Sequence, residues 1–148
     1  MHEPLIMTYK DRKIVVEPSV LIEIAKFRQC RVCQPEQGGT LIGEWRKQHM
    51  RVTGITRPQP QDKASRFSFE RCGRTHSKLI RKHWKESGEN INYLGEWHTH
   101  PELNPTPSGI DKRNWKQLSG PDPVLLMIQG TSTIWWGLLI SGRFEPLS

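Results

Sequence analysis

The amino-acid sequence predicts an α/β or α+β domain in which a mixed β-sheet is flanked by helices. Two observations lead to this fold class. Short apolar or alternating segments typical of strands interleave with segments of helical periodicity, and no internal repeat or long linker divides the 148 residues. A chain of this length buries roughly 68 to 70% of its unfolded surface, which is enough for one core. We therefore expect a single domain over residues 1–148.

The expected strands are short and apolar or alternating in character. They are Leu5 to Tyr9, Lys13 to Val16, Gly38 to Trp45, Met50 to Thr56, Phe67 to Phe69, Ile91 to Trp97, Val124 to Gln129, Thr133 to Ile140 and Arg143 to Glu145. The first two flank the polar turn Lys10-Asp11-Arg12, so we expect a hairpin. The segment Arg57 to Arg66 contains Pro58 and Pro60 and few apolar residues, which predicts an exposed loop.

Three helices are expected between these strands. The first extends from Pro18, which suits a first helical turn, to about Gln29. The second extends from Arg74 to Ser87 and stops at Gly88. The third extends from Ser108 to Leu118 and is begun by the Ser108 side chain.

The formal net charge of +7 is a property that concerns partners rather than the fold. It favours nucleic acid or an acidic protein surface, and the basic residues cluster between Arg71 and Lys85. Because charge runs are usually solvated, a solvated surface or a protein partner is favoured over nucleic acid. A nucleic-acid-binding module, suggested by the run Arg81-Lys82-His83-Trp84-Lys85, stays open as the alternative from a different functional class.

Cysteine usage and hydropathy predict a cytoplasmic protein that does not enter a membrane. The cysteines Cys30, Cys33 and Cys72 are odd in number, and the first two are too few for a four-ligand structural zinc site, so free or buried thiols are expected. Met1 to Lys10 lacks a basic stretch followed by an apolar run. The longest near-apolar segment, Ile134 to Ile140, is far shorter than the ~20 residues that span a bilayer.

The segment Gly95 to Asp111 carries the residues of a metal site. His98 and His100 are two apart on an expected strand, so their rings face the same side and can bind one ion at ~2.0 to 2.1 Å. Pro101 ends this strand, and Asp111 lies in the first turn of the next helix, where its carboxylate can return to the same face. Three protein ligands leave one tetrahedral position for water, which is typical of a catalytic zinc site.

Glu36 and Ser108 are candidate catalytic residues beside these ligands. Amide hydrolysis needs a group that takes a proton from water and delivers it to the leaving nitrogen. Glu36 is placed for this role just before the glycine-rich segment Gly38 to Gly43. The hydroxyl of Ser108 can donate a hydrogen bond to the negative charge of a tetrahedral intermediate.

Each of these residues also has a purely structural interpretation. Ser108-x-x-Asp111 matches a capping box with Asp in place of Glu. An HxH pair on a strand is often a satisfied pair of histidines, and a glutamate in a loop is usually solvated. Their joint occurrence at these spacings favours the metal site, and Ser108 can cap the helix and serve the site together.

The motif HxHPx6SxxD with a glutamate before a GGxLxG segment resembles that of the JAMM metallopeptidase family, also called the JAB/MPN family. Its positions are occupied by Glu36, His98, His100, Pro101, Ser108 and Asp111. The resemblance implies one JAB/MPN-like domain with a mixed central sheet flanked by helices, layered as in cytidine deaminases. It also implies one Zn²⁺ per chain on His98, His100 and Asp111, with Glu36 as general base and acid and Ser108 as oxyanion stabiliser. A deaminase itself does not fit, because that chemistry uses HxE followed by PCxxC.

Within this family, the text GEWHTHPE followed by PTPSGID and Trp115 is similar to short bacterial stand-alone members of antiviral CBASS operons. Those members undo conjugates in which the C-terminus of a cGAS-like nucleotidyltransferase is attached to a target. The attachment is made by a ligase resembling fused ubiquitin-activating and ubiquitin-conjugating enzymes. The resemblance therefore implies a deubiquitinase-like isopeptidase whose protein substrate has an extended C-terminal tail. Related operons conjugate a ubiquitin-like protein, so its deconjugation or processing stays open as the alternative.

Overall fold

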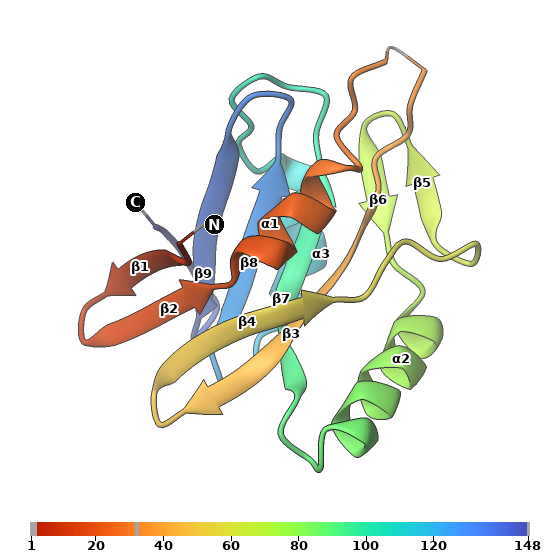
Figure 1. The fold of residues 1–148 in the computed structure, drawn as a ribbon. Helices are drawn as coiled ribbons and strands as arrows, with labels where there is room; N and C mark the ends of the chain where they lie inside the picture. The colour runs from red at the N-terminus through yellow and green to blue at the C-terminus, as the bar shows by residue number, and fades with distance from the viewer. Residues whose placement is uncertain (1–2, 32, 148) are drawn as a thin grey trace.

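A computed structural model describes residues 3–31 and 33–147, and it shows a curled mixed sheet with helices around it (Figure 1). Within these residues the main sheet has eight strands in the order β1-β2-β4-β3-β7-β8-β9-β10. Neighbours are antiparallel except for β2 with β4 and β7 with β8, which are parallel. In chain order the strands of this sheet are β1 (Leu5–Tyr9), β2 (Arg12–Val16), β3 (Gly38–Arg46), β4 (His49–Ile55), β7 (Asn92–Thr99), β8 (Val124–Gln129), β9 (Ile134–Ile140) and β10 (Arg143–Pro146).

Hydrophobic clusters lie on both faces of the sheet. The helices of the described residues are α1 (Pro18–Ala25), α2 (Gly73–Glu86) and α3 (Gly109–Lys116), and none is long and apolar enough to cross a membrane. On one face, Ile24 of α1 belongs to a cluster with Met127 of β8. On the other face, Trp115 of α3 packs with Leu126 and Ile128. Alternate residues of β8 thus enter different cores, as expected for a strand covered on both sides.

The predicted mixed sheet flanked by helices is confirmed, and most element bounds differ from the prediction by only one or two residues. Two predictions were wrong. Helix α1 ends at Ala25 rather than near Gln29, and the segment Arg57 to Arg66 is not entirely loop. It contains β5 (Lys63–Ser65), which pairs with β6 (Ser68–Glu70), where a strand over Phe67 to Phe69 had been predicted.

The early end of α1 has a local cause. Backbone bonds from Phe27 to Ile24 and from Arg28 to Ala25 span three residues, so the chain tightens out of the α-helix there. Phe27 nevertheless packs on Trp97, with ring centroids 5.5 Å apart. The apolar periodicity therefore continues past the last α-helical residue, and the sequence pattern overstates the length of the helix.

Strand β5 escaped prediction because its side chains carry no apolar signal. All three of its residues are exposed, and the strand is stabilised by pairing with β6 over Lys63 to Ser65 rather than by burial. Alternation of apolar and polar residues reports burial of one strand face, so a strand exposed on both faces leaves no such pattern.

Gly38 and Gly39 allow β3 to approach its neighbours closely, as the glycine-rich segment predicted. A Cβ atom would lie 2.4 Å from the carbonyl oxygen of Trp97 at the first position, and 2.0 Å from that of Thr56 at the second. Both obstacles are backbone atoms, which a side chain cannot push aside cheaply. The start of β3 therefore lies close against β7 on one side and against the residue that follows β4 on the other.

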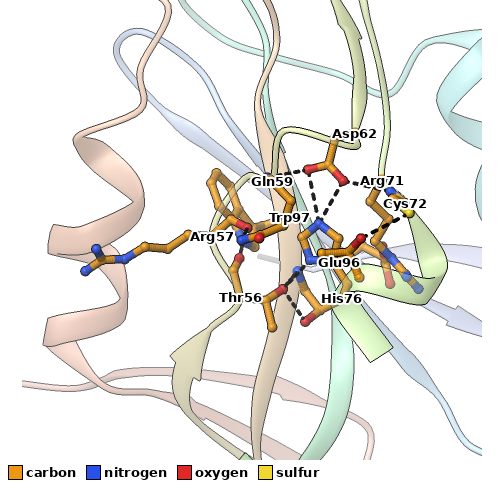
Figure 2. A network of polar contacts seen from close by, with 11 residues as sticks. Thr56, Arg57, Gln59, Asp62, Arg71, Cys72, His76, Glu96 and Trp97 are labelled. Carbon is orange, nitrogen blue, oxygen red and sulfur yellow. Dashed lines mark hydrogen bonds and ion pairs between the residues drawn. The ribbon is translucent and has the colours of Figure 1, made fainter. Parts of the chain in front are cut away.

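A buried polar network holds the segment that carries β5 and β6 (Figure 2). The Asp62 carboxylate accepts hydrogen bonds from the backbone N–H groups of Gln59 at 2.8 Å and Cys72 at 2.7 Å. Its oxygens lie 3.0 and 3.1 Å from Nε2 of His76, a fully buried residue of α2. The other ring nitrogen of His76 is 2.7 Å from the Thr56 hydroxyl. One carboxylate thus ties both ends of this segment to α2 and to the end of β4.

Replacement of Asp62 should destabilise the fold measurably. Asp62→Ala removes the acceptor of two backbone donors and of a buried imidazole, and each buried donor left without an acceptor costs about 1 to 3 kcal/mol. We expect the free energy of unfolding in urea to fall by roughly 2 to 4 kcal/mol. Asp122→Ala, at an exposed carboxylate, is the matched control. Equal stability of the two variants would contradict the anchoring role of Asp62.

Candidate metal centre

Two strand-end histidines and one helix-start aspartate converge on one point of the structure. His98 lies in β7, and His100 follows that strand, with its backbone N–H donating to the carbonyl of Gln129 at 3.0 Å. Because they are two residues apart in extended backbone, both rings leave the same face of the sheet. Asp111 is the third residue of α3. All three side chains are at least nine-tenths buried.

The distances among these side chains fit a tetrahedral metal ion. Nε2 of His98 is 3.2 Å from Nε2 of His100 and 3.2 Å from Oδ1 of Asp111, and Nε2 of His100 is 3.0 Å from Oδ2 of Asp111. Zinc bonds of about 2.0 to 2.1 Å at the tetrahedral angle would separate two ligand atoms by about 3.3 Å. The two imidazoles, each close to a different oxygen of Asp111, are therefore spaced in a way that is compatible with one zinc ion.

Glu36 stands farther from this point than the other three residues. Its Oε2 is 3.9 Å from Nε2 of His100, although all four side chains offer donor atoms within 4.8 Å of one another. Its Oε1 is buried and has no hydrogen-bond partner within the described residues. This spacing suits a carboxylate that acts beside a metal-bound molecule rather than as a fourth ligand.

Burial raises the pKa of Glu36 to about 8, because a charged carboxylate loses hydration there. The nearby His100 opposes this shift, and the negative charges of Asp111 and Glu102 add to it. In the metal-free protein Glu36 is thus largely protonated at neutral pH. A cation at the centre would favour its charged form, which is the form that accepts a proton.

Glu102 orients the second histidine. Its Oε1 lies 2.8 Å from Nδ1 of His100. A carboxylate can only accept, so Nδ1 donates and Nε2 is left to face the centre, an arrangement common around metal-bound histidines. Burial alone would lower the pKa of His100, but the hydrogen bonds and charges of Asp111 and Glu102 outweigh it and raise the pKa to about 9. For Asp111, burial is likewise outweighed by His100 and His98, and its pKa is lowered.

Ser108 forms the capping box that the structural interpretation predicted. Its hydroxyl accepts from the backbone N–H of Asp111 at 3.1 Å, and its own N–H donates to Oδ2 of Asp111 at 2.8 Å. A hydroxyl has one donor and two acceptor positions, so this cap leaves its donor available. The same pair of bonds fixes the carboxylate that faces the two histidines.

A cleft of about 240 Å³ reaches the centre, with His98 and Asp111 among its lining residues. Beside them the guanidinium of Arg71 donates to buried Glu96 at 2.6 Å (Figure 2). Burial raises the pKa of Glu96, and Arg71 opposes that shift. Trp115 also lines this cleft and packs on His98, with ring centroids 5.4 Å apart. Of the two tryptophans that flank the motif, Trp115 therefore packs at the centre, whereas Trp97 belongs mainly to the core on the opposite face.

The structure brings together all five residues that the sequence nominated, and around them it places buried or hydrogen-bonded polar residues that sequence reasoning did not nominate. They are Glu102, Glu96, Thr99 and Gln29. Glu102 follows the motif directly, so its spacing from His100 was an available signal. Gln29 is 70 positions from its partner Thr99, and nothing local pointed to that contact. The cysteine expectation agrees with the structure, in which Cys30, Cys33 and Cys72 are free thiols.

Comparison with known proteins gives a consistent picture. The family model described as prokaryotic homologs of the JAB domain matches residues 17–138. The chain is 36% identical to a CD-NTase/cGAS isopeptidase of Escherichia coli over 99% of this chain and 95% of that protein. It is 27% identical to a probable metalloprotease, y4qB, of Sinorhizobium fredii over 83% of this chain and 80% of that protein.

A solved structure supports the fold independently of sequence. Protein DSY2949 of Desulfitobacterium hafniense superposes with a TM-score of 0.69, covering 90% of this chain and 88% of that one, at 18% identity. A likeness at this identity establishes the fold alone. The match of the family model over residues 17–138 and the 36% identity to the E. coli isopeptidase show that this chain belongs to the prokaryotic JAB family of the JAMM (JAB/MPN) metallopeptidases.

Proposed function

We propose that this protein is a zinc-dependent isopeptidase that cleaves after the C-terminus of a conjugated protein. The observation that carries the proposal is the convergence of two imidazoles and one carboxylate at 3.0 to 3.2 Å, with a further buried carboxylate at 3.9 Å. Family membership and the isopeptidase and metalloprotease names of relatives support the same reaction class.

His98, His100 and Asp111 would hold the zinc ion, one per chain. When bound, zinc supplies a Lewis acid and lowers the pKa of a coordinated water. Glu36 would accept a proton from the attacking water and pass it to the leaving nitrogen. The Ser108 hydroxyl, whose donor remains available in the cap, donates to the oxyanion of the tetrahedral intermediate.

The substrate we propose is a cGAS-like nucleotidyltransferase joined to a target through its C-terminal tail, in CBASS antiphage defence in the cytoplasm. The name of the E. coli relative supports this substrate class. A ligase resembling ubiquitin-activating and ubiquitin-conjugating enzymes would make the conjugate. A bacterial ubiquitin-like protein is the second candidate, and parallel assays with both kinds of purified conjugate would separate the two.

The basic residues noted in the sequence belong largely to α2, where Arg74, Lys78, Arg81 and Lys85 are exposed. This keeps nucleic acid as a partner of a different class. Binding to single- or double-stranded DNA or RNA that weakens steeply with added salt would support such a role. Absence of binding at low salt would remove it.

Glu36→Gln should abolish cleavage without removing the metal. The amide keeps the size of the side chain but cannot accept and transfer the proton, a role worth about 10²- to 10⁴-fold in rate. Zinc content, measured by metal analysis, should stay near one per chain. Glu44→Gln on β3 is the matched control and should retain activity. Full activity of Glu36→Gln would overturn the assignment of the base.

Removal of zinc should lower thermal stability through the same ligands. A ligand that binds only the folded state adds about 4 kcal/mol at a thousandfold excess over its dissociation constant. We expect chelation to lower the melting temperature of the wild type. The Asp111→Asn variant should melt at the same temperature with and without zinc. A zinc-dependent shift that survives in Asp111→Asn would exclude Asp111 as a ligand.

Zinc binding at neutral pH should release protons. The surroundings raise the pKa of His100 to about 9, so its ring must lose a proton before Nε2 can bind zinc at pH 7, and the cation also favours loss of the proton on Glu36, whose pKa is raised to about 8. The apparent affinity should therefore rise as pH rises toward 9. Calorimetry in two buffers of different ionisation enthalpy measures the proton count. A count of zero at pH 7 would contradict the raised pKa.

Ser108 variants separate capping from catalysis. Ser108→Gly removes the hydroxyl but costs a helix N-terminus only a few tenths of a kcal/mol, so stability should be nearly unchanged. If the hydroxyl stabilises the oxyanion, kcat should fall about 10²-fold or more, and Ser108→Thr should restore part of it. An unchanged kcat in Ser108→Gly would exclude oxyanion stabilisation and leave helix capping as the role of Ser108.

A further inference from the structure

Gln29 is a buried polar residue that bridges three segments near the metal centre. It follows α1, and only 4% of its surface is exposed. Its side-chain nitrogen donates to the carbonyl oxygens of Gln34 at 3.0 Å and Arg66 at 3.1 Å. Its side-chain oxygen accepts from the Thr99 hydroxyl at 3.0 Å. Both amide hydrogens and the oxygen are used, so the network specifies glutamine rather than glutamate.

Thr99 connects Gln29 to the residue after Glu36. It stands between His98 and His100, but its side chain leaves the opposite face of the extended strand. Its hydroxyl accepts from the N–H of Gln37 at 3.0 Å, and its own N–H donates to the carbonyl of Gln37 at 2.8 Å. The segment that carries Glu36 is thereby joined to the strand that carries the histidines.

The other side of Glu36 is held by β5. The N–H of Glu36 donates to the carbonyl of Ser65 at 2.7 Å. The next carbonyl, that of Arg66, accepts from Gln29. Gln29 therefore bonds on both sides of Glu36. On one side it binds the hydroxyl of Thr99, and on the other it binds the carbonyl of Arg66, the residue after β5.

This arrangement matters because the carboxylate of Glu36 has little side-chain support of its own. Its Oε1 has no hydrogen-bond partner within the described residues, and its Oε2 lies 3.9 Å from Nε2 of His100. Hydrogen bonds to the carboxylate therefore contribute little to the position of this side chain, which depends on its packing and on the backbone that carries it. Proton transfer requires close approach, and a misplacement of about 1 Å can cost about 10²-fold in rate.

We propose that Gln29 is a positioning residue for Glu36, acting through Thr99 and through the carbonyls of Gln34 and Arg66. It touches neither substrate nor metal. The inference rests on the proposed role of Glu36 in proton transfer. Loss of the Gln29 amide should loosen the Glu36 backbone while leaving the ligands His98, His100 and Asp111 in place.

The test compares Gln29→Met, which keeps the length of the side chain but makes none of the three bonds, with Gln48→Met at an exposed position of the β3–β4 turn. We expect a fall in kcat of about 30-fold or more for Gln29→Met, with KM and zinc content unchanged. In the metal-free protein, hydrogen exchange at the amides of Glu36 and Gln37 should become faster than in the wild type. Gln48→Met should match the wild type in every measurement.

Thr99 supplies a second pair of variants in case Gln29→Met folds poorly. Thr99→Ser retains the hydroxyl and should keep kcat and amide protection, whereas Thr99→Val has nearly the same shape without the bonds and should lose both. Full kcat and amide protection in Thr99→Ser, with loss of both in Thr99→Val, would support a positioning role for the hydroxyl. A simple loss of packing would not give this difference between the two variants.

Three results would overturn the proposal. They are an unchanged kcat in folded Gln29→Met, a loss confined to KM, and a parallel loss of zinc, which would assign the network to the ligands instead. The proposed function fails separately, through full activity of Glu36→Gln. In that event the exchange rates at Glu36 and Gln37 still report whether Gln29 fixes this backbone.

Discussion

The pairing of β7 between β3 and β8 is the constraint on which the site depends. His98 is paired with Gly38 on one side and with Ile128 on the other, so the backbone that carries the first histidine is hydrogen-bonded within the middle of the sheet. A strand paired on both sides cannot slip by one residue without turning every side chain to the wrong face. Because the register of β7 is fixed, the rings of His98 and His100, two residues apart, are held on the same face of the sheet.

Strand β7 also separates the candidate metal centre on one face of the sheet from the Thr99–Gln29 hydrogen-bond network on the other. On one face the histidines meet Asp111 at the end of a cleft, and on the other Thr99 joins an amide network that excludes solvent. Burial is costly for a carboxylate that lacks partners, as the raised pKa of Glu36 shows. Such a cost is tolerated where the surrounding structure fixes the group and where function needs it reactive. The backbone bonds on each side of Glu36 supply that fixation.

Sequence reasoning reached the fold class, and it nominated five residues that the structure brings together, because their signals are local or follow a spacing motif. His98 and His100 lie on one strand, and Ser108 with Asp111 on one helix turn. It failed where the determinant is a hydrogen-bonding partner rather than a pattern of apolar residues. Strand β5 is exposed and is stabilised by its pairing with β6. Gln29 lies beyond the end of α1 and is held by hydrogen bonds to Gln34, Arg66 and Thr99. Neither event changes the local hydrophobic pattern, so no periodicity could report it.

The capping box and the proposed metal site use the same carboxylate, so they are compatible rather than competing interpretations of Ser108 and Asp111. The N–H of Ser108 binds Oδ2 of Asp111 at 2.8 Å, and that same oxygen lies 3.0 Å from Nε2 of His100. A carboxylate oxygen has two lone-pair positions, so it can serve the cap and the centre together. The two capping-box bonds fix the orientation of the Asp111 side chain. Its carboxylate is therefore in place beside the histidines before any metal binds. Helix initiation therefore preorganises the third donor, as the central strand does the first two.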